Sequence, residues 1–392
     1  MTATRDAGAR IEVAQIVTRF IAGAGGVALR GALSLDPGRY RVTIVTGEGG
    51  ALTDRAAEAG MKVVLEPSLV SPIAPRSDAT ALARLTTICR DEGFDVVHTH
   101  SAKAGALGRI AAHRAGVPVV VHTYHGFPFH DFQDPVRHAA YVAIERRLSR
   151  ITDHVLAIGT GVAAEALRRG LARPSNLHTV APVVESVTVP KDAWTRSAAR
   201  ALLGLPDDAT VIGTVARADF QKAPEHLLAA LEQMRHTEAM VAWVGGGPLV
   251  ESIRKRAAER GLADRFLMLG ERSDVAQVLP AFDVFALPSR YEGLPCAIVE
   301  AMRCGIPVVA SSVNSVPDLV IPGRSGVLVP PGRPDLMAEA VDGLLDDPER
   351  AERLVAGAAV LAGETYDAER LAVVLDEVYR SGLTAHTLAM AG

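Results

Sequence analysis

Residues 284–302 read Val284-Phe-Ala-Leu-Pro-Ser-Arg-Tyr-Glu-Gly-Leu-Pro-Cys-Ala-Ile-Val-Glu-Ala-Met302, which is a short apolar run, a loop and a helical pattern in direct succession. The run Val284–Leu287 predicts a buried strand, and Pro295 suits the first turn of the helix that follows. Similar successions of strand and helix recur along the chain. This repetition indicates parallel sheets with right-handed crossovers, and we predict an α/β protein.

Short β-branched runs form two series, with Ala-rich helical patterns between them. We therefore predict two doubly wound, Rossmann-like domains, 1–185 and 191–365, that face a central cleft. The stretch Pro182–Pro190 has no helical period and predicts a linker, and a helix over 366–382 is expected to pack back on the first domain. The predicted strands are Ile11–Val17, Arg41–Thr46, Lys62–Leu65, Asp95–His98, Val117–Tyr124, His154–Ile158 and Leu177–Val180, then Val211–Val215, Met240–Val244, Arg265–Leu269, Val284–Leu287, Pro307–Ala310 and Gly326–Val329.

Composition excludes several classes of protein. The chain has 392 residues, 48% apolar and 22% charged, which excludes a disordered or low-complexity chain. Its net charge of −4 argues against a dedicated nucleic-acid binder. Three cysteines give no disulfide framework, and no apolar run is long enough to span a bilayer. The amino-terminal residues lack the pattern of a signal peptide, so we expect a cytoplasmic protein.

A Gly-rich turn follows the first predicted strand. Gly23-Ala-Gly25-Gly26-Val-Ala28 fits the dinucleotide fingerprint G-x-G-x-x-A, although residues 18–22 separate it from the strand end. The favoured interpretation is a loop that closely approaches a ligand. Binding of NAD(P) stays open as an alternative.

The second half carries a stronger signal for an anionic ligand. Arg217 and Lys222 follow the strand Val211–Val215 in one loop, and the turn Gly245-Gly-Gly-Pro248 follows the next strand. Because the carboxyl ends of parallel strands meet at one edge of the sheet, both cations and two helix N-termini are expected to lie there. This combination predicts a diphosphate site.

These segments, with two carboxylates spaced as Glu292-x7-Glu300, resemble the retaining glycosyltransferases of family 4, which have the two-domain GT-B fold. The resemblance covers nearly the full chain. Its other motifs are the glycine turn Gly25-Gly26, the segment His98-Thr-His100-Ser-Ala-Lys103-Ala-Gly105, the pair His125-Gly126, Val215-Ala-Arg217 with Gln221-Lys222, and Gly245-Gly-Gly-Pro248.

The resemblance implies a role for each motif. The domain 191–365 would bind a nucleotide-sugar donor, and the domain 1–185 an acceptor. Glu292, with the amides of Gly293 and Leu294, would hold the transferred sugar, and Glu300 would bind the ribose diol. The predicted catalytic residues are His125 and Glu292; the donor residues are Gly26, Arg217, Lys222, Gly246, Arg272, Gly293, Leu294 and Glu300; and the acceptor residues, which flank neighbouring strand ends, are His100, Lys103 and Phe127.

Two positions depart from the family pattern. Gly246 stands where the family usually has an acidic residue, and Asn314-Ser315-Val316-Pro317-Asp318 replaces the usual Gly-Gly before a Pro-Glu pair. Both changes bear on donor identity. His98 and His100 alternate along a strand and share a face, yet no carboxylate or further histidine follows at a known ligand spacing, and no D-x-D sequence occurs. We therefore predict no metal site.

The sequence thus predicts a retaining, metal-independent glycosyltransferase without a cofactor. It would transfer a hexose or N-acetylhexosamine from a nucleoside diphosphate, with UDP preferred, to a saccharide, lipid-linked or small-molecule acceptor. A nucleotide-sugar epimerase of the same fold is the first alternative, and an NAD(P)-dependent oxidoreductase the second. Peripheral contact of the first domain with the inner face of a membrane stays open.

Overall fold

The computed structural model describes residues 10–21, 23–181, 184, 189–366 and 368–391. The chain divides into unit 1, residues 1–183 with 367–392, and unit 2, residues 184–366. The domains that we predict from the sequence are 1–185 and 191–365. Of the predicted linker, residues 182–183 and 185–188 lie outside the described residues.

Unit 1 is built on a parallel sheet. Within its described residues, seven strands follow the order β3-β2-β1-β4-β5-β6-β7, so the chain reverses direction across the sheet between β1 and β4. Its central strands β1, β4 and β5 are almost entirely buried because helices cover both faces, and each combines apolar residues with buried polar residues toward its carboxyl end. The strands are β1 Ile11–Val17, β2 Tyr40–Thr46, β3 Lys62–Leu65, β4 Val96–His100, β5 Val119–Tyr124, β6 His154–Ile158 and β7 Leu177–Val180.

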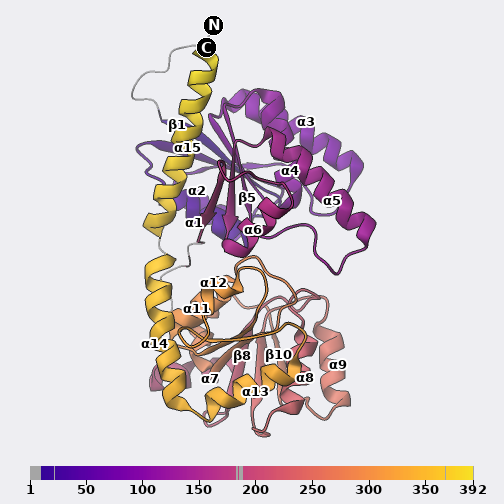
Figure 1. The fold of residues 1–392 in the computed structure, drawn as a ribbon, viewed down its shortest axis with the longest axis vertical. Coiled ribbons are helices and arrows are strands. Elements are labelled where there is room, and N and C mark those ends of the chain that lie inside the picture. Colours follow the sequence, from indigo (N-terminus) through magenta and orange to yellow (C-terminus); the bar gives the residue numbers. More distant parts are fainter. Residues whose placement is uncertain (1–9, 22, 182–183, 185–188, 367, 392) are drawn as a thin grey trace. The chain divides into compact units, whose positions relative to one another are not determined.

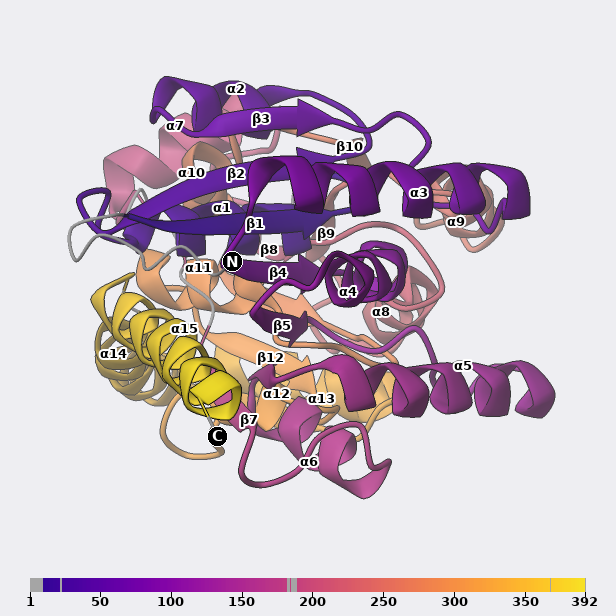
Figure 2. The ribbon, with the colours of Figure 1, turned by 90° about the horizontal axis from the view of Figure 1, so that it is seen from above.

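Helices cover both faces of this sheet. The helices α3 and α4 pack together on one face, and α1 packs with α15 on the other; both ribbon views show this arrangement (Figures 1 and 2). The helices of unit 1 are α1 Ala24–Ser34, α2 Ala51–Glu58, α3 Pro75–Glu92, α4 Ala102–Ala115, α5 Pro135–Leu148, the 3₁₀ turn η1 Ser149–Ile151, α6 Thr160–Arg168 and α15 Ala368–Ala391.

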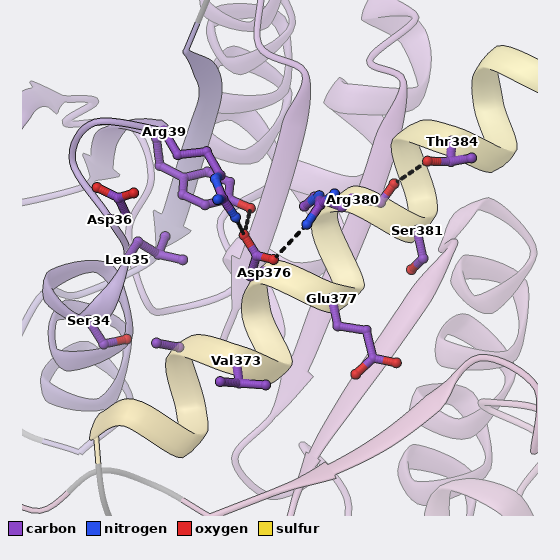
Figure 3. Close-up of a pocket in the computed structure, with 12 residues that line it drawn as sticks. Ser34, Leu35, Asp36, Arg39, Val373, Asp376, Glu377, Arg380, Ser381 and Thr384 are labelled. Atoms are coloured by element: carbon purple, nitrogen blue, oxygen red, sulfur yellow. Dashed lines mark hydrogen bonds and ion pairs between the residues drawn. The ribbon is translucent and has the colours of Figure 1, made fainter.

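The last helix, α15, is longer than the sequence pattern predicts, because it continues past residue 382 to Ala391 through Ala, Leu and Met residues that favour helices. Asp376 on α15 accepts hydrogen bonds from Arg39 Nη1 at 2.6 Å and Tyr40 Oη at 2.8 Å (Figure 3). These groups line an open groove of about 600 Å³. On another side of the helix, a Cβ at Gly382 would lie 2.7 Å from Val119 of β5, so only glycine permits this close approach.

Unit 2 repeats the same topology. Its six described strands follow the order β10-β9-β8-β11-β12-β13, with the reversal between β8 and β11. Fully buried Trp243 on β9 donates its indole N–H to the carbonyl of Ala216 at 2.8 Å, which fixes the loop that leaves β8. The strands are β8 Val211–Val215, β9 Met240–Val244, β10 Phe266–Gly270, β11 Val284–Leu287, β12 Val308–Ser311 and β13 Val327–Val329.

The helices of unit 2 also lie on both faces of its sheet. The helices α8, α9 and α13 form one layer, and α11 with α14 contributes to the other (Figure 1). All predicted strands of both units agree with the structure to within two residues at each end. The helices are α7 Ala193–Leu203, α8 Pro224–Gln233, α9 Val250–Glu259, α10 Val275–Val278, the 3₁₀ turn η2 Leu279–Ala281, α11 Cys296–Cys304, α12 Val316–Leu319, α13 Pro334–Leu345 and α14 Pro348–Thr365.

Candidate active site

The predicted donor residues lie where the strand order of unit 2 reverses. The loop after β8 carries Arg217 and Lys222, and the loop after β11 carries Glu292. Because β8 and β11 are neighbours in the sheet, these loops leave the same edge side by side. Ligands of open parallel sheets bind at such reversal points, outside the carboxyl ends of the strands.

Glu292 is held by several donors at once. Lys222 Nζ lies 2.6 Å from Oε1 of Glu292, and the Ser289 hydroxyl donates to the same oxygen at 2.6 Å. Gln221 Nε2 donates to Oε2 at 3.3 Å. Only 3% of the Glu292 side chain is exposed, so the lysine neutralises a buried carboxylate and the other donors fix its orientation.

Asn314 supports Glu292 from a third loop. The backbone N–H of Glu292 donates to Oδ1 of Asn314 at 2.8 Å. Asn314 has a φ of 44°, in the left-handed region that asparagine tolerates better than most residues. Within the described residues, the other non-glycine residues with positive φ are Ser101 and Ala223, which precede α4 and α8 at the reversal points of the two sheets. Such backbone conformations cluster at functional sites.

Arg217, in the same loop as Lys222, has a solvent-exposed guanidinium group. Its side chain is 67% exposed, and its Nε lies 3.9 Å from the carboxylate of Asp219, which is a weak ion pair. The glycine turn adjoins this loop, because the Ala218 N–H donates to the carbonyl of Gly246 at 2.8 Å. Gly245 and Gly247 adopt φ of 143° and 146°, and a Cβ on either would lie within 2.4 Å of a carbonyl oxygen of the loop.

The remaining predicted donor residues lie around these loops in unit 2. Gly293 and Leu294 lie in the loop just before Pro295, the N-cap of α11, and Glu300 lies one turn inside that helix. Arg272 follows β10 and forms two hydrogen bonds with Asp274, at 2.8 and 2.6 Å. Their contacts with a donor stay predictions. Gly26 belongs to unit 1, where it is buried in α1 beside the guanidinium of Arg30.

In unit 1, the corresponding reversal point brings histidines together. His100 ends β4 and His125 follows β5, and their Nδ1 and Nε2 atoms lie 2.9 Å apart. His100 Nε2 lies 2.6 Å from the amide oxygen of Gln15 on β1. Burial lowers the pKa of His125 to about 3, with a smaller contribution from the Arg30 guanidinium, and it lowers the pKa of His100 well below its ordinary value. Both rings are therefore neutral near pH 7.

The predicted acceptor residues differ in exposure. His100 is 3% exposed and uses both ring nitrogens inside unit 1, so it reaches an acceptor only if this network opens. Lys103 Nζ pairs with Asp78 at 2.6 Å. Phe127 is partly exposed and stacks on Phe129, with ring centroids 4.8 Å apart. Contacts of these residues with an acceptor stay predictions.

Several supporting residues have no individual sequence signal. Gln15 and Tyr379 act through contacts between distant elements, whereas Ser289, Asn314 and Gln221 belong to segments named in the sequence analysis that gave none of them a contact with Glu292. In the part of the chain that the structure describes, no group of three or more His, Cys, Asp and Glu side chains is arranged to hold a metal ion. Across those same residues, no helix is both long and apolar enough to cross a bilayer.

Comparison with known families matches both halves of the chain. Residues 22–182 match the model described as a glycosyl transferase 4-like domain, and residues 195–360 match the model of glycosyl transferases group 1. The D-inositol 3-phosphate glycosyltransferase of Xylanimonas cellulosilytica is 33% identical over 74% of this chain and 73% of its own length. An Escherichia coli UDP-Gal:α-D-GlcNAc-diphosphoundecaprenol α-1,3-galactosyltransferase is 28% identical over 86% of this chain and 89% of its own.

Solved structures give the same fold. The crystal structure of Anabaena HepE in complex with UDP and glucose has a TM-score of 0.82 with this chain, at 21% identity, and covers 95% of this chain and 100% of that one. The chain therefore belongs to the group 1 glycosyltransferases of the family 4 type, which confirms the predicted family. The predicted GT-B fold class, with two Rossmann-like parallel-sheet domains, is confirmed as well.

Proposed function

We propose that this glycosyltransferase is a retaining, metal-independent enzyme that transfers a hexose or N-acetylhexosamine from a UDP-sugar donor. The observation that carries the proposal is the pairing of Glu292 with Lys222 at the reversal point of the unit 2 sheet, where the same loop as Lys222 also carries the exposed cation Arg217. UDP is preferred because the E. coli relative is a UDP-galactose enzyme by name and HepE was crystallised with UDP. We also propose that the enzyme acts in the cytoplasm and needs no cofactor.

We propose that protein groups, and not a metal ion, neutralise the negative charge that develops on the departing UDP. Arg217 and Lys222 are the cations of the β8 loop, and the amides that precede α11 add fixed dipoles at the same edge. Donors that are already in place when charge develops on the diphosphate stabilise the transition state without reorganisation. Activity is therefore expected to survive EDTA.

Retention of configuration is assigned to a front-face displacement. The bond between the anomeric carbon and the UDP oxygen breaks, and the acceptor oxygen forms its bond to the same face of that carbon. The acceptor proton passes to an oxygen of the departing phosphate, so the chain supplies no nucleophile. Glu292 positions the sugar, and neutral His125 accepts a hydrogen bond from a sugar hydroxyl.

The acceptor class that we favour is a saccharide, including a lipid-linked one. The E. coli relative acts on a diphosphoundecaprenol-linked GlcNAc by name. Exposed Val136 and Ile144 share one face of α5 with Arg137 and Arg147, a combination that suits an anionic bilayer surface. We propose that this face makes the peripheral membrane contact. The double variant V136E/I144E should lose co-sedimentation with anionic vesicles and keep its affinity for UDP.

The proposal is tested by screening UDP-sugars with and without saccharide acceptors. An anomeric NMR time course should show a product with the donor configuration, whereas an inverted product contradicts the mechanism. A changed nucleotide sugar formed without an acceptor would support the epimerase alternative. Membership of a glycosyltransferase family leaves the NAD(P) alternative without support.

The donor site has its own test. R217A should weaken UDP binding by about one to two decades, because a charge-assisted hydrogen bond contributes roughly 1.5–3 kcal/mol. R254A is the matched control, since this arginine on α9 is also exposed and paired with a nearby carboxylate, Glu251, at 2.7 Å. Equal UDP affinity of R217A and wild type would contradict the site.

A further inference from the structure

A row of hydrogen bonds crosses the face of the unit 1 sheet that α15 covers. It starts at Tyr379 on α15, whose hydroxyl lies 2.7 Å from Nδ1 of His98 on β4. Gln15 Nε2 on β1 donates to the same hydroxyl at 3.1 Å, and its Oε1 contacts His100, which in turn contacts His125. The first four of these residues are at most 3% exposed, so water does not compete for their hydrogen bonds.

The chemistry of each group gives this row a direction. The Gln15 amide oxygen only accepts, so His100 donates through Nε2. A neutral imidazole carries one N–H, which makes Nδ1 of His100 an acceptor for Nε2–H of His125. Nδ1 of His125 then holds a lone pair and no proton.

The same reasoning applies at the other end of the row. The Tyr379 hydroxyl accepts from Gln15 and donates its own proton to Nδ1 of His98. His98 donates through Nε2 to Thr123 Oγ1 at 2.7 Å. Every bond therefore runs in a consistent direction from His125 to Thr123.

We propose that Tyr379, Gln15 and His100 are positioning residues that keep the proton of His125 on Nε2 and its lone pair on Nδ1. The inference rests on the proposed function, in which that lone pair accepts a hydrogen bond from a hydroxyl of the transferred sugar. Which nitrogen of a histidine is protonated is set by the hydrogen bond that the other nitrogen makes.

Tyr379 has a particular place in this row because its hydroxyl holds the nitrogen end of the Gln15 amide. Without that hydroxyl, the amide is free to turn over, and its NH₂ group would then donate to His100. His100 would in turn donate to Nε2 of His125, and the proton of His125 would move to Nδ1. A residue of the last helix thus controls a ring that lies more than two hundred residues earlier in the chain.

The experiment reads the tautomer of His125 by ¹⁵N-edited NMR of the imidazoles in the full chain, assigned with the variant H125A. The wild type should show protonated Nε2, and Y379F should show a mixed or reversed tautomer with turnover reduced about tenfold and an unchanged affinity for UDP. The matched control is Y40F. The Tyr40 hydroxyl also forms a hydrogen bond with α15, by donating to Asp376, and the Tyr40 ring lies 5.9 Å from that of Tyr379. Y40F should keep the wild-type tautomer and turnover.

Each outcome decides one point. Protonated Nδ1 in wild-type His125, which can be read even if Y379F does not fold, overturns the inference, as does a wild-type tautomer in folded Y379F. Near-normal turnover of folded H125A instead overturns the role of His125 in the proposed function. Loss of activity in H125A together with the expected tautomers supports both.

Discussion

The Nζ atom of Lys222 lies 2.6 Å from Oε1 of Glu292, so a cation from the loop after β8 neutralises a carboxylate from the loop after β11. The pair joins the two loops across the point where the strand order reverses. The lysine is 19% exposed and the glutamate 3%, which makes the carboxylate the more strongly desolvated partner. The same pair thus stabilises the ligand-free loops and places both proposed donor-binding groups at one edge of the sheet.

The pair predicts an asymmetric effect on stability. K222M removes the cation and leaves the buried Glu292 carboxylate without its counter-charge, which should cost about 3 kcal/mol in the free energy of unfolding. The double variant K222M/E292Q removes the charge of both partners while Ser289 and Gln221 stay in place, so it should regain most of that loss. Urea titration of the full chain measures both. Equal stability of the single and double variants would show that Lys222 does not stabilise Glu292.

The glycine turn after β9 predicts that neighbouring glycines differ in tolerance. G245A and G247A should each lose about 2 kcal/mol or more, because their Cβ atoms would lie 2.0 and 2.4 Å from the carbonyl oxygens of Ala216 and Ala218. G246A should stay within about 0.5 kcal/mol of wild type, since the nearest atom to its Cβ would be 3.7 Å away.

Thermal unfolding measures these three variants, and UDP titration separates stability from binding. If Gly246 contacts the donor as the sequence predicts, G246A is folded and binds UDP less tightly. A G246A variant as unstable as the other two would contradict the described turn.

Much of the fold could be predicted from local patterns. Strands such as Ile11–Val17 and Val211–Val215 are short, apolar and β-branched, and their positions follow from sequence alone. The meeting of Arg217, Lys222 and Glu292 at one edge also follows, because parallel strands end at the same side of a sheet.

Direct contacts within the sites could not be predicted in this way. Lys222 and Glu292 are 70 residues apart, and Gln15 and Tyr379 are 364 apart, so their hydrogen bonds depend on strand register and helix packing. The sequence assigned the lysine to a diphosphate and the glutamate to a sugar, without a bond between them. The extension of α15 to Ala391 could not be predicted from periodicity, because residues 384–391 are mostly exposed and follow no apolar repeat.

Asn314 predicts a difference between two small replacements. N314G keeps a residue that tolerates a φ of 44° and loses only the acceptor for the Glu292 N–H, so it should lose about 1 kcal/mol of stability from that hydrogen bond alone. N314A loses the same acceptor and adds left-handed strain of about 1 kcal/mol. Thermal unfolding should therefore rank N314A below N314G. Equal stability of the two variants, which lose the same acceptor, would mean that the side chain, and not the backbone, accounts for asparagine at this position.

The histidines of unit 1 predict that acid destabilises this unit in particular. Burial lowers the pKa of His98 and His125 to about 3 and that of His100 and His122 well below the ordinary value near 6.5. The unfolded chain therefore binds more protons than the folded one between about pH 6.5 and 3. The contribution of these histidines to stability is full above that range and is lost as the pH drops through it.

Native-state hydrogen exchange at pH 7 and pH 5, corrected for intrinsic rates, should show lower protection of the β4 and β5 amides at pH 5. The β8 and β9 amides of unit 2 serve as the internal control and should change less. Equal losses in both units would indicate that acid acts on the whole chain and that the neutral histidines are not its cause.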